Sequence, residues 1–129
     1  MKSLVALIII AAGAISLVFG IVFIVQAGSG RQQIADDIAP LTLDQVDAKY
    51  DDVAVKYNAM RNAEEPKIQA ETATPSAMYN YLAIQRTSLG LARTSKGVAD
   101  FTKTTGIIDI ILGVGFLLAG MVLMQEKAT

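Results

Sequence analysis

The chain has 129 residues, 53% hydrophobic and 18% charged, and its eleven basic and twelve acidic side chains leave a net charge of −1. With no basic excess to bind a phosphate backbone, the composition argues against a nucleic-acid partner. Because the chain contains neither cysteine nor histidine, disulfides, thiolate metal sites and Ser-His-Asp triads are excluded.

The first element expected is a membrane-spanning helix near the N-terminus. Leu4 to Val25 is a run of 22 residues without a charge, and a bilayer core requires ~20 helical residues. A cleaved signal peptide is the alternative, but its apolar core usually has only ~7–15 residues before an A-x-A-like site. The sequence "VQAGSG" is a poor cleavage site. We therefore predict a transmembrane helix over residues 1–27 that acts as an uncleaved signal-anchor.

Residues 28–106 are predicted to form an extramembrane segment. Gly28-Ser29-Gly30 is interpreted as a hinge after the first span, and Pro40 breaks the following pattern. A helix is expected over about 42–65, with Thr42 and Gln45 forming a capping box and Pro66 ending the helix. Its apolar residues alternate at spacings of three and four, as in a coiled-coil seam: Leu43, Val46, Tyr50, Val53, Tyr57 and Met60.

A second helix is expected over about 76–104, after Pro75 and with Ser76 as a candidate cap. It either continues into the second span as one rod or bends near 104–106. Because the connection is short and both ends return to one membrane face, the two helices should form an antiparallel hairpin. The inner seam predicted for this helix includes Tyr81, Ile84, Ser88, Leu91, Ser95 and Val98.

The second helix contains the pattern RTS-x-G twice, at Arg86 to Gly90 and at Arg93 to Gly97. On this seam Arg86 and Arg93 point away from the first helix, to solvent or to a partner. Two glycines inside a helix each cost ~1 kcal/mol relative to alanine, so close packing should offset them. We predict that Ser88 and Gly90 lie opposite Tyr50. Ser95 and Gly97 are predicted to lie opposite Leu43.

The last segment, residues 107–129, is predicted to be a second transmembrane helix with a short tail. Ile107 to Met124 contains one charge, Asp109, in 18 residues. Small residues recur along both spans, often seven apart, and such rows let membrane helices approach closely. The spans are expected to pack on each other, on copies of themselves or on a larger complex. The residues expected to pack are Ala6, Gly13, Ser16, Gly20, Gly106, Gly113, Gly115, Ala119 and Gly120.

Asp109 is the ionisable residue within a predicted span, and such residues are candidates for function. It lies about one turn from the loop-side end. Three interpretations stay open: a carboxylate near the headgroups, bonded to Thr105 or Gln26; a contact to a partner subunit; or a site of ion translocation.

The fold class predicted is an all-α membrane protein with two transmembrane helices joined by an extramembrane helical hairpin. No catalytic residue, cofactor site or metal site is predicted. We expect an accessory membrane subunit, not an enzyme, that contacts the lipid bilayer and a larger membrane complex or its own copies, with Arg86, Arg93 and Asp109 as candidate partner contacts. The alternatives are an exported ligand-sensing or adaptor module, and a small oligomeric ion-conducting proteolipid that uses Asp109.

The predicted location is the plasma or inner membrane. An even number of spans places both termini on one side, and a signal-anchor exports the segment after it. Both termini are therefore expected in the cytoplasm and the hairpin outside.

Overall fold

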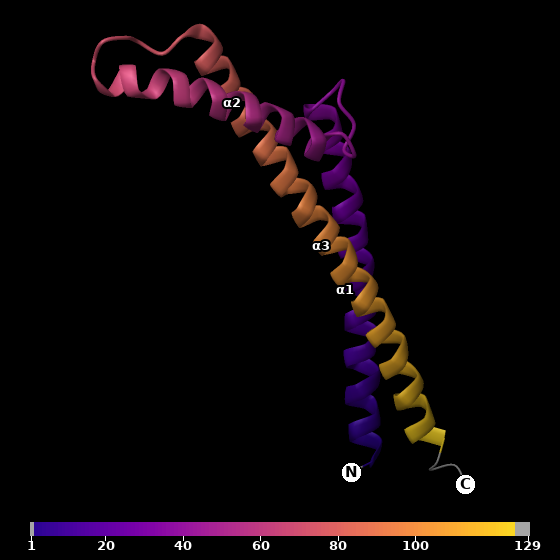
Figure 1. The fold of residues 1–129 in the computed structure, drawn as a ribbon. Coiled ribbons are helices and arrows are strands. Elements are labelled where there is room, and N and C mark those ends of the chain that lie inside the picture. Colours follow the sequence, from indigo (N-terminus) through magenta and orange to yellow (C-terminus); the bar gives the residue numbers. More distant parts are fainter. Residues whose placement is uncertain (1, 126–129) are drawn as a thin grey trace. The chain divides into compact units, whose positions relative to one another are not determined.

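The computed structural model describes residues 2–125, and within this range the chain is all-helical. Three helices follow one another: α1 at Lys2–Asp37, α2 at Val46–Gln69 and α3 at Ala77–Gln125 (Figure 1). The ends of the two predicted transmembrane segments, Met1 and the tail from residue 126 to 129, lie outside the described residues.

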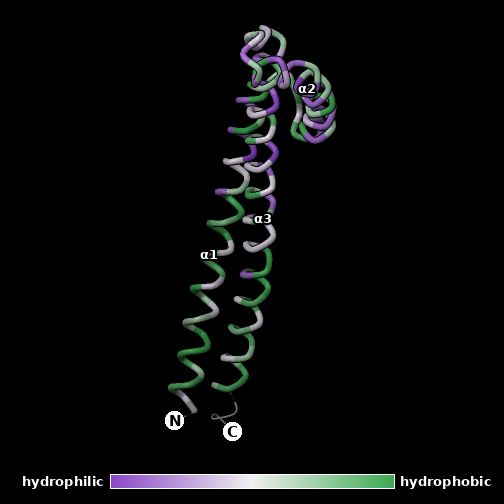
Figure 2. The backbone as a smooth tube through the Cα atoms, turned by 60° about the vertical axis from the view of Figure 1, so that its left-hand side comes forward, coloured by the Kyte–Doolittle hydropathy of each residue, from purple (hydrophilic) through white to green (hydrophobic). Residues whose placement is uncertain are grey.

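Helices α1 and α3 are long and apolar enough to cross a membrane. Figure 2 shows hydrophobic residues gathered along the parts of these two helices that lead to the chain ends. Helix α1 is longer than predicted, because Gly28, Ser29 and Gly30 are helical and form no hinge. No glycine among the described residues has a positive φ, so the GSG sequence takes ordinary helical geometry and α1 ends at Asp37, shortly before Pro40.

Helix α2 lies four residues further along the chain than expected. One half of the predicted capping box is present, since the backbone N–H of Thr42 donates to Oε1 of Gln45 at 3.0 Å. Residues 43–45 nevertheless form a turn, and the helix begins at Val46. Pro66 lies inside the last turn instead of ending the helix.

The end of α2 is set by Glu71, which adopts the left-handed conformation with φ of 55°. The N–H of Glu71 donates to the Ile68 carbonyl at 3.0 Å, and the N–H of Thr72 donates to the Lys67 carbonyl at 2.9 Å. These two bonds form a Schellman motif, which normally has glycine at the left-handed position.

Helix α3 is continuous from Ala77 to Gln125, so the alternative of a bend near 104–106 is not observed. Its start matches the expectation, because Oγ of Ser76 accepts a hydrogen bond from the N–H of Tyr79 at 3.1 Å. This is the usual geometry of a serine N-cap.

The described chain forms two compact units. The first combines the beginning of α1, up to Gly30, with α3 from Val98 onward, and the second comprises Arg31–Gly97. The second unit has a small apolar core of Val53, Leu82 and Leu89, against which Tyr50 and Tyr57 pack.

Candidate interaction surfaces

In the first unit, α1 and α3 pack antiparallel through their small residues. A methyl group added to Gly20 would lie 2.6 Å from the Gly106 carbonyl oxygen, and one added to Gly13 would lie 2.8 Å from the Gly113 carbonyl oxygen. Gly120 faces Ala6 and Ile10. Real Cβ atoms do not approach neighbours this closely, so only glycine permits this backbone separation at these positions.

Other small residues predicted for this contact have different surroundings. Oγ of Ser16 donates to the Asp109 backbone carbonyl at 2.8 Å, which adds a polar link between the helices. Gly115 has nothing within 4 Å of an added Cβ, and Ala119 is exposed. Gly115 and Ala119 therefore lie outside the α1–α3 contact.

Asp109 is half-buried and meets α1 through its backbone carbonyl. Among residues 2–125, its carboxylate has no ion-pair partner, and the expected side-chain bonds to Thr105 or Gln26 are not found.

In the second unit, α2 contacts α3 through the seam predicted for α2. Val46 and Val53 are fully buried, and Tyr50, Tyr57 and Met60 pack against or around the core. Leu43 is half-buried in the turn before the helix. The seven-residue pattern of this helix was therefore sufficient to identify its inner face.

The seam predicted for α3 is wrong by about one position. Tyr81, Ile84, Leu91 and Val98 are 58%, 71%, 70% and 61% exposed, whereas Leu82 and Leu89 are buried. Ser88 is exposed, and Ser95 is half-buried on the side of α3 near Ile34 and Ile38 rather than facing α2. Of the two glycines, Gly90 does lie against Tyr50, at 3.2 Å from an added Cβ, but Gly97 has no neighbour within 4 Å.

Arg86 and Arg93 face α2, whereas the sequence predicted that they point away from it. The guanidinium of Arg93 lies 5.2 Å from the centre of the Tyr50 ring, and that of Arg86 lies 5.1 Å from the centre of the Tyr57 ring. Each arginine places its charged group over a tyrosine ring, a contact of ~0.5–1 kcal/mol at an exposed site.

An acidic cluster on α2 pairs with one of these arginines. Nε of Arg93 lies 2.8 Å from Oδ1 of Asp47, and Nη1 of Arg93 lies 3.6 Å from Asp51. Lys96 also donates to Asp47 at 3.0 Å. The hydrogen bond from Lys96, aided by Arg93, holds the pKa of the Asp47 carboxyl below its ordinary value.

At the other end of α2, Glu64 binds the start of α3. Its carboxylate accepts hydrogen bonds from Oγ of Ser76 at 2.7 Å and from the Ser76 N–H at 2.9 Å. These two bonds lower the pKa of Glu64. Nearby, the hydroxyl of Tyr57 lies 3.5 Å from that of Tyr79, and this hydrogen bond is the main cause that raises the pKa of Tyr79 to about 12.

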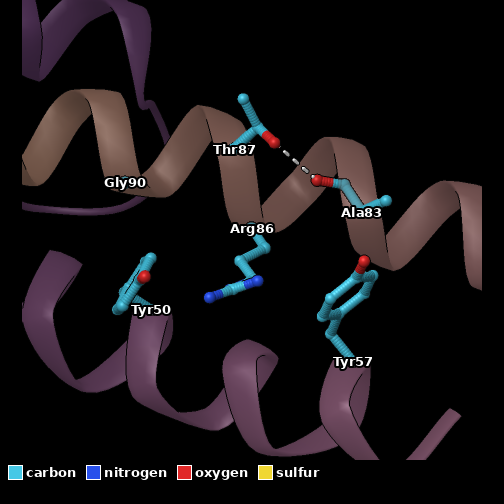
Figure 3. Close-up of a pocket in the computed structure, with 6 residues that line it drawn as sticks. All are labelled: Tyr50, Tyr57, Ala83, Arg86, Thr87 and Gly90. Atoms are coloured by element: carbon cyan, nitrogen blue, oxygen red, sulfur yellow. Dashed lines mark hydrogen bonds between the residues drawn. The ribbon is translucent and has the colours of Figure 1, made fainter. Parts of the chain in front are cut away.

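A cavity of about 230 Å³ lies between α2 and α3, beside Arg86. Figure 3 shows the guanidinium between the rings of Tyr50 and Tyr57, with Gly90 and Thr87 on the facing helix. Nε of Arg86 is buried and has no hydrogen-bond partner within residues 2–125. The hydroxyl of Thr87 is already used, since it donates to the Ala83 carbonyl at 2.9 Å.

Sequence reasoning missed Asp47, Asp51, Glu64, Lys96 and Tyr79 as contact residues. The contacts of Arg86 and Arg93 with tyrosine rings were missed as well. For these contacts a usable signal was present, because Tyr50 and Tyr57 are seven apart, as are Arg86 and Arg93. Two equal offsets on neighbouring antiparallel helices predict two equivalent pairs.

The described residues contain no group of three or more acidic side chains placed to hold a metal ion. Comparison of the chain with protein-family models, with curated proteins and with solved structures gives no match.

Proposed function

We propose that this chain is a non-catalytic accessory membrane protein that spans the bilayer twice and presents the α2–α3 hairpin to a partner subunit or to a second copy. The observation that carries the proposal is that small and large apolar residues lie on different faces of α1 and α3. Small residues form the contact between them, while large apolar side chains cover the remaining surface. Leu7, Ile8, Ile111 and Leu118 are 60%, 59%, 66% and 58% exposed.

Such a surface needs an apolar environment. Fully burying one large aliphatic side chain is worth ~1.5–3 kcal/mol, and exposed apolar patches of this extent are rare on soluble monomers. A bilayer covers the surface without any further protein contact. A core helix of a soluble protein would be mostly buried, whereas little of the apolar stretch of α1 or α3 is buried within the chain.

The hairpin supports a role in protein contact. Between α2 and α3, Arg93 and Lys96 pair with Asp47 and Asp51. Elsewhere on α3, Tyr81, Ile84 and Leu91 form an uncharged exposed row. These apolar side chains are three and seven residues apart, so they lie on one face of α3, which is a suitable surface for another helix. We propose that this face docks on a helix of a partner or of a second copy.

The orientation we propose depends on the first span. We propose that this span acts as a signal-anchor that exports the segment after it, which places the hairpin outside and the termini in the cytoplasm.

The test is the native mass of the protein extracted from membranes in mild detergent. The proposal predicts that the chain sediments with membranes after carbonate washing and elutes in a stoichiometric assembly. Replacing Ile84 and Leu91 together by glutamine should release the single chain. The control replaces two other exposed residues, Val55 and Lys56 on α2, by glutamine and should leave the assembly intact. A parent protein that is soluble without detergent would contradict the membrane assignment, and a strictly monomeric parent would contradict the accessory role.

A further inference from the structure

Arg86 and Arg93 occupy equivalent settings on α3. They are seven residues apart, and each lies over a tyrosine of α2, with the two tyrosines also seven apart. The α2–α3 contact therefore repeats itself after two helical turns, and each arginine can be compared directly with the other.

The two settings differ in their acidic partners. Arg93 is paired with Asp47 and Asp51. Seven residues further along α2, the equivalent positions are Ala54 and Asn58, so no carboxylate within residues 2–125 occupies a position equivalent to Asp47 or Asp51 beside Arg86. The position equivalent to Lys96, which also binds Asp47, is the buried Leu89.

Two observations at Arg86 are consistent with the absence of an acidic residue at the positions equivalent to Asp47 and Asp51. Its Nε is buried without a partner among the described residues, and a cavity of about 230 Å³ opens beside it, lined by Tyr50, Tyr57 and Gly90 (Figure 3). A buried donor left unsatisfied is costly, and a cationic donor more so. The cavity is large enough for a group of a few heavy atoms and too small for an extended ligand.

We propose that the Arg86 cavity is a binding site for a carboxylate group supplied from outside the chain. The carboxylate would take at Arg86 the place that Asp47 and Asp51 take at Arg93, accepting a hydrogen bond from Nε and pairing with the guanidinium fork. The tyrosine rings on either side limit the width of the ligand. This inference does not depend on how the spans are inserted in a membrane.

The carboxylate can come from two sources: a small free carboxylate, or a glutamate or aspartate side chain of a docked protein. Both present the same group to Arg86. They differ in the atoms attached to the carboxylate, so probes with and without a peptide backbone distinguish them.

The experiment uses the full chain in detergent and records its thermal unfolding midpoint at constant ionic strength. In the first series sodium acetate replaces sodium chloride. In the second, an end-blocked tripeptide is added whose one charged residue is a glutamate. A saturable rise in the midpoint is expected with at least one probe. Acetate alone would indicate a free metabolite, and the peptide alone a protein side chain.

Two variants assign the rise to the cavity. Arg86→Gln should weaken the apparent affinity by roughly tenfold or more, since a charge-assisted bond is lost, whereas the matched variant Arg93→Gln should retain the response. Asn58→Asp should supply an internal carboxylate, raise the midpoint without ligand and reduce the response. The same change at exposed Asn62, outside the cavity, should leave the response as in the parent.

The proposal is overturned if neither probe gives a saturable rise, or if Arg86→Gln responds as the parent does. If Arg86→Gln does not fold, Asn58→Asp decides: a response equal to that of Asn62→Asp contradicts the proposal.

Discussion

At the scale of single residues, Glu64 and Ser76 form a cap shared between two helices. Ser76 accepts from the first turn of α3 and simultaneously donates two hydrogen bonds to Glu64 of α2. In a capping box, the acidic residue lies three positions after the cap. Here the carboxylate comes from twelve residues earlier in the chain, so it fixes the start of α3 against the end of α2.

This shared cap predicts a dependence of stability on pH. The pKa of Glu64 in the folded chain lies below its ordinary value of 4.5. The stability that Glu64 contributes is therefore complete above pH 4.5 and is lost as the pH falls through the folded pKa. Glu64→Gln should be less stable at pH 7 and should lose less stability between pH 7 and pH 3. Far-UV circular dichroism during thermal unfolding measures both effects.

Ser76→Ala should reproduce the loss at neutral pH, at ~1 kcal/mol for a lost N-cap. The control is Glu71→Gln in the exposed loop, which should keep the acid response of the parent. An acid response of Glu64→Gln equal to that of the parent would contradict the shared cap.

Single residues also show where sequence patterns are informative. Ser76 was predictable because a cap residue acts on its own helix. The end of α2 was not, because the left-handed residue is Glu71 rather than glycine, and because Pro66 is accommodated in the last turn. Glu64 was missed because its partner belongs to another helix, and no local pattern reports such a pairing.

At the scale of helices, the apolar pattern identified the inner face of α2 but not that of α3. On α3 the more apolar row, with Ile84 and Leu91, is exposed. The contact with α2 uses Leu82, Leu89 and the guanidinium groups of two arginines. Arginine buries its aliphatic stem and stacks on aromatic rings. A periodicity count that assigns arginine to solvent therefore chooses the wrong face.

The glycines of α3 provide a matched test of the α2–α3 contact. Gly90→Leu should destabilise the hairpin by ~1–3 kcal/mol, because its side chain meets the Tyr50 ring at 3.2 Å and overpacks the contact. Gly97→Leu should instead stabilise α3 by up to ~1 kcal/mol, since leucine favours helix and Gly97 has no neighbour within 4 Å. Chemical denaturation measures both, and equal effects would contradict the observed register.

The α1–α3 contact is one of three arrangements expected from the seven-residue rows of small residues, which could also have packed on copies of the chain or on a larger complex. Gly106→Ala should cost ~1–3 kcal/mol, since the added methyl would lie 2.7 Å from the Gly20 carbonyl oxygen and push the helices apart. Gly115→Ala, on the same helix but in open space, should be neutral or stabilising. Thermal unfolding in detergent compares the two variants, and a destabilised Gly115→Ala beside an unaffected Gly106→Ala would refute the contact.

At the scale of the whole molecule, the chain combines two kinds of helix contact. In the unit that holds most of the apolar residues, glycine and alanine permit close approach, as in membrane helix pairs. In the unit of residues 31–97, ion pairs and tyrosine–arginine stacking surround a small apolar core. This contrast is typical of a chain whose parts fold in two solvents, lipid and water.

The proposed membrane-spanning arrangement is tested most directly by labelling single introduced cysteines, since the sequence contains none. Thr74→Cys lies in the exposed loop before α3, and Ile111→Cys lies on the exposed apolar face of α3. In intact cells, a membrane-impermeant maleimide should label Thr74→Cys readily and Ile111→Cys only after detergent is added. Equal labelling of both positions without detergent would contradict a chain that spans the membrane.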